Sequence, residues 1–249
     1  MRLERLEIVS SFDHDEFAAI ASGVAARNIA SRIGGALEAD SILGLAPPEA
    51  TRLHVRAEEA LVAIALNRFT YALAFPPPHS VQYGEALDRA VGEAEAVLAE
   101  LYKSGMKYAW TGIVADFYFP SPPSEQNSGI AAVRPIARRV LRLDGFIDSL
   151  SAFQCRVGHE IDGKFRTYDV RGYERRELLL AGPSARAQWP VYPKSMPPDE
   201  FGVNIVLDVN NKPSSARTNP LEDLYHVAAS HRDAHRTLRP DLGLEGVLP

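Results

Sequence analysis

The stretch from Thr51 to Met106 constrains the fold most, because a β-like hydrophobic pattern is followed there by a long helical one. Apolar and polar residues alternate from Arg52 to Glu58, and Leu61 to Leu66 is continuously apolar. Alternation returns at Phe69, Tyr71, Leu73 and Phe75, before three prolines. A period of two indicates strands with one wet face, and a short continuous apolar run is typical of a central strand. We expect three antiparallel strands, the last two joined by a tight turn at Asn67-Arg68.

A long amphipathic helix is predicted after the prolines. Ser80 is a suitable N-cap, and Gly105 is a natural stop. Between them, apolar residues recur at intervals of three and four, which places them on one helical face. These residues are Tyr83, Leu87, Val91, Ala94, Leu98 and Leu101.

Composition narrows the class of protein. The chain has 249 residues, 46% of them hydrophobic, so it can bury one large core or two smaller ones. Its formal charge of −5 argues against a general nucleic-acid binder. The net charge is still compatible with a local basic patch. The single cysteine, Cys155, excludes an intrachain disulfide and a cysteine-based zinc site. No apolar run approaches the roughly 20 residues that span a bilayer, so we expect a cytoplasmic protein without a membrane partner.

The rest of the first half is expected to begin with a strand over residues 3–9. Acidic residues, helical spacing and the Gly34-Gly35 stop predict a helix over residues 13–35. Residues 36–50 contain Pro47 and Pro48 and are interpreted as a crossover loop.

The second half contains similar elements in the same order. A strand is predicted over residues 107–120 and a short helix over residues 130–143. Residues 149–161 alternate, and Asp162-Gly163 is favoured where both central turn residues need positive φ, so a hairpin is expected there. Residues 201–211 form another alternating segment. A final helix is predicted from Asn219-Pro220 to about Arg239.

Each half is therefore predicted to run strand, helical crossover, three strands, long helix. We expect an α+β protein of two similar units, each an antiparallel four-stranded sheet with a helical crossover after its first strand and a long C-terminal helix. The first β-rich unit would cover residues 1–106 and the second residues 107–249.

This order of elements resembles the SecB-like export chaperone fold, present twice. The segments LNRFTYALAFPPPHSVQYGEALDRAVGEAEAVL, KYAWTGIVADFYFP and GVNIVLDVNN resemble a sporadically distributed, uncharacterised bacterial family of about this length, most clearly at Arg68-Phe69-Thr70. SecB-like proteins bind extended polypeptide in apolar grooves and form oligomers. The resemblance thus implies a polypeptide or protein partner and a homo-oligomer, with no cofactor and no catalytic residue.

Few residues suggest chemistry. His231 and His235 share a face of the final helix and could supply two metal ligands, but the apolar residues on that face favour packing instead, and we expect no metal. Cys155 alternates with Phe153 and Val157, so we expect a buried small side chain; a thiolate paired with His159 is the less favoured interpretation. For Asp208 and Asn210-Asn211, at a strand end, we favour a turn or capping role over ligand binding.

The segment from Arg134 to Arg176 carries ten basic and six acidic residues, a surplus of four. If its arginines converge, they could bind a phosphate, a nucleotide or an acidic partner. Arg166, Arg171 and Arg175 are the candidate ligand-binding residues. A solvated sheet face with cross-strand ion pairs is the competing and favoured interpretation.

Two functions remain open from the sequence. The first is a non-enzymatic SecB-like binding, chaperone or adaptor protein that recognises polypeptide. The second is an enzyme or small-ligand or anion receptor whose site lies between the two units, with His231 or His235 assisting. A weaker third hypothesis, an accessory role in a defence or toxin system, follows only from the sporadic distribution of the resembling family.

Overall fold

The computed structural model describes residues 1–12, 28, 30–31, 36–39, 51–57, 59–65, 67–77, 79, 81–103, 108–122, 128–141, 150–176, 198–212, 219–245 and 248. Most of the helix predicted over residues 13–35 lies outside these residues, as do Ser80, Gly105 and the unit boundary at residues 106 and 107.

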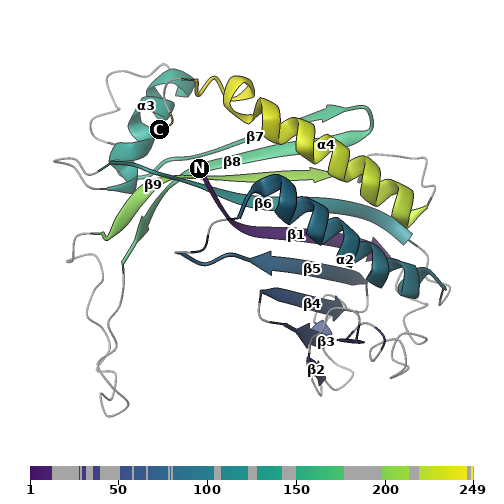
Figure 1. Ribbon diagram of the computed structural model, residues 1–249. Helices are drawn as coiled ribbons and strands as arrows, with labels where there is room; N and C mark the ends of the chain where they lie inside the picture. Colours follow the sequence, from purple (N-terminus) through teal and green to yellow (C-terminus); the bar gives the residue numbers. More distant parts are fainter. Residues whose placement is uncertain are drawn as a thin grey trace, which may run out of the picture.

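One nine-stranded sheet runs through the described part of the molecule (Figure 1). Its strand order is β2-β3-β4-β5-β1-β6-β9-β8-β7, and every neighbouring pair is antiparallel. The strands are β1 (Arg2–Phe12), β2 (Ala36–Ala39), β3 (Thr51–Arg56), β4 (Ala60–Ala65), β5 (Arg68–Ala74), β6 (Tyr108–Pro120), β7 (Gln154–Ile161), β8 (Lys164–Arg175) and β9 (Glu200–Asn210).

Three helices pack on the same face of this sheet: α2 (Tyr83–Lys103), α3 (Gly129–Leu141) and α4 (Pro220–Asp241). α2 contacts β1 and β5, α3 contacts β8 and β9, and α4 lies over β6, β8 and β9. None of the helices in the described ranges is long and apolar enough to cross a membrane.

The predicted α+β class with an antiparallel sheet is confirmed, and so is the three-strand meander β3-β4-β5 followed by a long helix. Both halves contribute to one continuous sheet, because β1 pairs with β6 from Arg2 to Phe12. The prediction of a loop throughout residues 36–50 is wrong at its start. Ala36–Ala39 form β2, which pairs with β3. Four residues are too few for a hydrophobic period to be recognised.

The core lies between the helices and the sheet. Alternate residues of each central strand, such as Ile8 of β1, Ile113 of β6 and Ile205 of β9, are fully buried beneath the helices. Each such aliphatic side chain contributes about 1.5–3 kcal/mol by leaving water. The alternation that predicted the strands therefore also identified the face that the helices cover.

The Asp162-Gly163 hairpin between β7 and β8 is confirmed, with φ of 51° and 68° at the two turn residues. The predicted burial of the β7 face that carries Cys155 is wrong: Cys155 is only half-buried, and Val157 is 43% exposed. The reason is position, because β7 is the last strand of the described sheet, beyond the area that α3 and α4 cover.

The N-terminus of α4 is capped as predicted, since the Asn219 side chain accepts a hydrogen bond from the Leu221 amide at 2.9 Å. The helix continues slightly past Arg239 and ends at Asp241.

Candidate functional site

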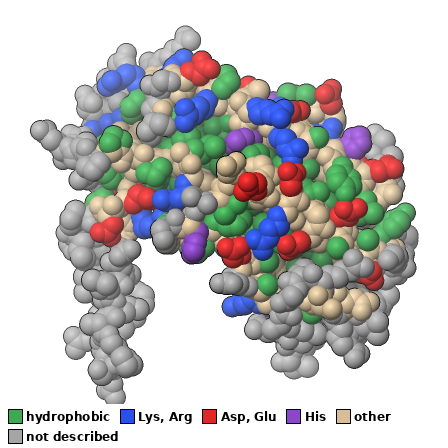
Figure 2. Space-filling view, viewed as in Figure 1, with side chains coloured by type: hydrophobic (Ala, Val, Ile, Leu, Met, Phe, Trp, Pro, Cys, Tyr) green, Lys and Arg blue, Asp and Glu red, His purple; other side chains and the backbone are tan. Residues whose placement is uncertain are grey.

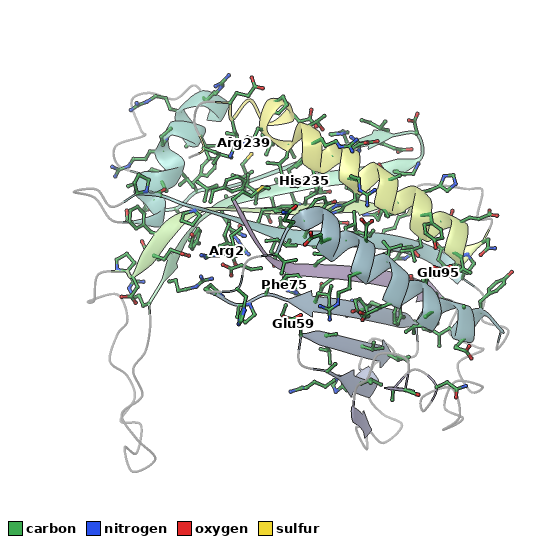
Figure 3. All side chains as sticks on the ribbon, viewed as in Figure 1. Arg2, Glu59, Phe75, Glu95, His235 and Arg239 are labelled. Carbon is green, nitrogen blue, oxygen red and sulfur yellow. The ribbon has the colours of Figure 1, made fainter. Side chains whose placement is uncertain are left out.

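The candidate site is an open groove of about 490 Å³ where α2 begins, next to the C-terminal half of α4. Leu3 of β1 and Met1, which directly precedes that strand, line this groove at the N-terminal end of the chain. Phe117 of β6 and His235 of α4 line it as well. The segment that opens α2 provides the remaining wall, Val81, Gln82, Tyr83 and Gly84. Figure 3 shows His235 on the α4 side of this region. The groove thus lies between elements from the two halves of the chain.

A second depression of about 500 Å³ shares Met1 and His235 with the first. It is lined further along α4 by Arg236, Arg239 and Pro240, and by Glu245 after the helix. An apolar and aromatic groove therefore leads into a charged one (Figure 2 shows both kinds of side chain on this helix-bearing face). Such a surface suits a ligand with an apolar part followed by a polar or charged part.

A buried hydrogen-bond chain supports the floor of the groove. The Tyr83 hydroxyl lies 2.6 Å from Nδ1 of His231, and Nε2 of His231 lies 3.3 Å from the carbonyl oxygen of Leu207. A carbonyl only accepts, so Nε2 carries the proton and Nδ1 accepts from the tyrosine. The chain links α2, α4 and β9, and it uses both nitrogens of a completely buried imidazole.

Burial keeps these groups neutral. Loss of water lowers the pKa of His231 to about 3, with a smaller effect from nearby His235 and Arg166. Burial also raises the pKa of the Tyr83 hydroxyl. Near neutral pH the pair is therefore an uncharged tyrosine donating to an uncharged histidine, which is a structural bond and not an acid–base pair poised to react.

His235 is the aromatic centre of the groove. Its ring stacks on Tyr83 with centroids 3.9 Å apart and lies 5.0 Å from the Phe117 ring. Burial, followed by the charge of Arg236, lowers its pKa to about 4, so it is neutral at physiological pH. Its Nε2 is buried and has no hydrogen-bond partner among the described residues. One buried polar atom of this aromatic wall therefore lacks a protein partner in the part of the chain that the structure describes.

The two histidines do not form a metal site together. His231 has no free nitrogen, and the described residues contain no group of three or more His, Cys, Asp or Glu side chains that could hold a metal ion. The spacing of four residues on a helix identified a shared face. It did not reveal that α2 and β9 would bind both ring nitrogens of His231.

The three candidate arginines are not brought together. Arg166 lies on the helix-covered face and donates to Ser230 of α4 at 3.2 Å. Arg171 lies on the opposite face, where it donates to Asn204 at 2.8 Å. Arg175 shares that open face because it is four residues further along the strand. An anion site would require these arginines to converge, and they do not, because residues at even and odd positions of a strand point to opposite faces of the sheet.

Arg175 belongs instead to an ion cluster with Arg2, Glu4 and Glu200. Its guanidinium lies 2.6 Å from Glu4 and 3.1 Å from Glu200, and Arg2 contacts Glu200 through two nitrogens at 2.8 and 2.6 Å. The Tyr173 hydroxyl also donates to Glu200, at 3.0 Å. The two positive charges of the arginines match the two negative charges of the carboxylates. Their contacts connect β1, β8 and β9, as in the cross-strand ion pairs that the sequence favoured for this sheet face.

The remaining candidates have structural surroundings. Cys155 and His159 are four residues apart along an extended strand, about 13 Å, so they form no dyad. Asn211 accepts from the Thr111 amide at 2.7 Å, and Asn210 accepts from the Lys212 amide at 3.3 Å. The Asn210 bond fits the favoured turn role, whereas the Asn211 bond joins the strand end to β6.

Sequence reasoning missed the groove itself. Tyr83 was recognised only as the first member of an apolar helical stripe, and Phe117 only as a strand residue. A tyrosine at the start of such a stripe is a weak signal, since its hydroxyl needs a partner when buried. That partner lies 148 positions away in the chain.

No protein-family model matches this chain, and no curated protein has significant sequence similarity to it.

Proposed function

We propose that this protein is a non-enzymatic, SecB-like binding protein that recognises an extended polypeptide segment, as a chaperone or adaptor does. The observation that carries the proposal is the groove between α2 and α4, in which aromatic and apolar side chains line an open surface. The buried bond between Tyr83 and His231 beside it is fully used in holding the helices together. Apolar lining with few free polar groups suits side chains of an unfolded segment.

Strand order supports a SecB-like duplication. In the first half, β1 pairs with β5, the last strand of the meander β3-β4-β5. In the second half, β6 pairs in the same way with β9, the last strand of β7-β8-β9. Each meander precedes a long helix, α2 or α4. We infer that residues 1–106 and 107–249 are two copies of one unit, joined through β1 and β6.

Peptide binding at the groove can be tested with a fluorescent, extended apolar peptide and a matched pair of valine variants. Val81 is half-buried at the groove, and Val9 is half-buried on the opposite face of the sheet. Val81→Glu should weaken binding at least about tenfold, because a carboxylate loses its hydration in an apolar site. Val9→Glu should bind as the wild type does. Absence of peptide affinity in the wild-type protein, or equal loss in both variants, would overturn the proposal.

A small-ligand or anion receptor at the same groove is the second candidate. The specific observation in its favour is the buried, unpartnered Nε2 of His235, with Arg236 nearby in the adjoining depression. A thermal-shift screen with nucleotides, phosphate and metal ions, together with elemental analysis, separates it from peptide binding. A ligand that stabilises the wild type but not His235→Phe would support a receptor. No stabilisation by any of these compounds would exclude it.

A further inference from the structure

We propose that β7 is a self-association edge, along which a second copy of this chain adds antiparallel to extend the sheet. β7 is the outermost strand in the described sheet order, and only β8 pairs with it there. The other end of the order, β2, has four residues, whereas β7 has eight. A long edge strand offers a row of unpaired backbone donors and acceptors to another chain.

The hairpin turn determines which backbone groups point outward. Ile161 and Lys164 flank the two-residue Asp162-Gly163 turn, so they form a hydrogen-bonded pair. Hydrogen-bonded residues then alternate along β7. Consequently the amide and carbonyl groups of Gln154, Arg156, Gly158 and Glu160 face away from β8, toward the free edge.

β7 lacks two features that often block edge pairing, a bulge and a proline. Its register with β8 is continuous over all eight residues, without a bulge, and the strand contains no proline. Val157 and Ile161 are 43% and 41% exposed on the helix-side face of the strand. Apolar side chains on a regular, unprotected edge favour burial against another strand.

The side chains of β7 are complementary to themselves. In a two-fold pairing centred on Gly158, Arg156 lies opposite Glu160 of the second copy, and the symmetry produces this charge pair twice. Neither side chain has an ion-pair or hydrogen-bond partner among the described residues, and both are exposed. Centring the pairing on Val157 instead would place Arg156 opposite glycine and leave both charges unmatched. Cross-strand opposite charges stabilise a pairing, so charge selects the register at Gly158.

The same register also brings together the side chains on the helix-side face of the two β7 strands. Cys155 would lie opposite Ile161 of the second copy, and Val157 opposite His159. At the centre, Gly158 is covered on the open face by the Phe165 ring, since a Cβ at this glycine would lie 2.7 Å from the Phe165 Cζ atom. A glycine shielded by an aromatic ring can remain in a regular strand while the two backbones approach closely.

A charge-swap experiment on the full-length chain tests the pairing. Arg156→Glu and Glu160→Arg each replace two attractive pairs by two repulsive ones, so each should weaken a dimer of the 27.3 kDa chain at least about tenfold. The double variant R156E/E160R restores opposite charges and should dimerise as the wild type does. Sedimentation velocity over a range of concentrations measures the dissociation constants, and circular dichroism verifies that each variant is folded.

Hydrogen exchange localises the contact. The amides of Arg156, Gly158 and Glu160 should be protected more strongly at high than at low protein concentration. A wild-type protein that stays monomeric, a dimer that the single variants do not weaken, or a double variant that fails to restore association would each overturn the proposal. Edge binding of an unrelated extended peptide by a strictly monomeric protein would overturn it as well.

Discussion

The hydroxyl of Tyr83 and Nδ1 of His231 lie 2.6 Å apart, and this contact joins the start of α2 to the middle of α4. Arg232, the next residue of α4, forms an ion pair with Asp88 of α2. Tyr225, earlier in α4, donates to Glu95, later in α2, so the two helices run antiparallel along a common seam. Antiparallel helices drawn from the two halves of the chain are thereby held together beside the groove. Any change in this seam should affect both stability and the shape of the groove.

Tyr83→Phe should destabilise the protein by about 1–3 kcal/mol, because Nδ1 of the buried His231 loses its donor. Urea unfolding followed by circular dichroism measures the change. Tyr225→Phe is the matched control: Tyr225 also bridges α4 to α2, through Glu95, but it is 49% exposed. Its free energy of unfolding should change by less than about 0.5 kcal/mol. Equal effects of the two variants would contradict a buried bond.

Acid should destabilise the protein through His231. Its pKa in the folded protein is about 3, below the ordinary value of 6.5, so between these values the unfolded chain binds a proton that the folded chain does not. Stability is complete above about pH 6.5 and is lost as the pH falls, with a slope of up to about 1.4 kcal/mol per pH unit from this residue.

Urea unfolding of the wild type and of His231→Gln at several pH values between about pH 7 and about pH 4 isolates this contribution. Glutamine does not titrate, so the variant should lose less stability than the wild type over the range. Other acid-sensitive groups, such as Glu200 with its lowered pKa, contribute equally to both proteins. Parallel pH profiles would show that His231 does not remain neutral in the folded protein.

Two glycine-to-alanine changes should have opposite signs. Gly163 in the β7–β8 turn has a φ of 68°, where an alanine is strained, so Gly163→Ala should cost about 1 kcal/mol or more. Gly92 lies within α2, and apart from its own helical backbone and chain neighbours nothing lies within 4 Å of the place that an added Cβ would take. Gly92→Ala should therefore stabilise by about 0.5–1 kcal/mol. Thermal unfolding of both variants checks the signs.

Gly172 should tolerate no side chain. A Cβ there would lie 2.4 Å from the carbonyl oxygen of Gly129, where α3 begins against β8. Gly172→Ala should therefore displace α3 and cost about 1–3 kcal/mol. Chemical denaturation gives the size of the loss, and Gly84→Ala, at a position with nothing within 4 Å of the added atom, is the control that should not be destabilised by crowding. A neutral Gly172→Ala would contradict the close approach of α3 to the sheet.

Much of the architecture was predictable from local patterns. Period-two alternation identified β3, β5 and β9, β-branched and aromatic content identified β6, and the Asp-Gly pair identified the β7–β8 hairpin, because these patterns depend on neighbouring residues. The Asn219-Pro220 start of α4 followed from capping chemistry. The β7 face was misjudged because alternation reports which side chains share a face, while burial depends on whether a helix reaches the edge of the sheet.

The candidate site was much less predictable. His231 and His235 were recognised as a pair on one face, yet the sequence could not assign one ring to a closed hydrogen-bond chain and the other to an open aromatic groove. Arg166, Arg171 and Arg175 lie within ten residues of each other but on two faces of β8, with separate partners in α4, β9 and β1.

The meander β3-β4-β5 and the long helix α2 were determined by the sequence itself, since strand alternation and helical periodicity act over a few residues. The tertiary structure alone decided that β1 meets β6 and that Tyr83 meets His231. These contacts join residues more than about 100 positions apart, and their energy comes from burying surfaces that no local pattern pairs with each other.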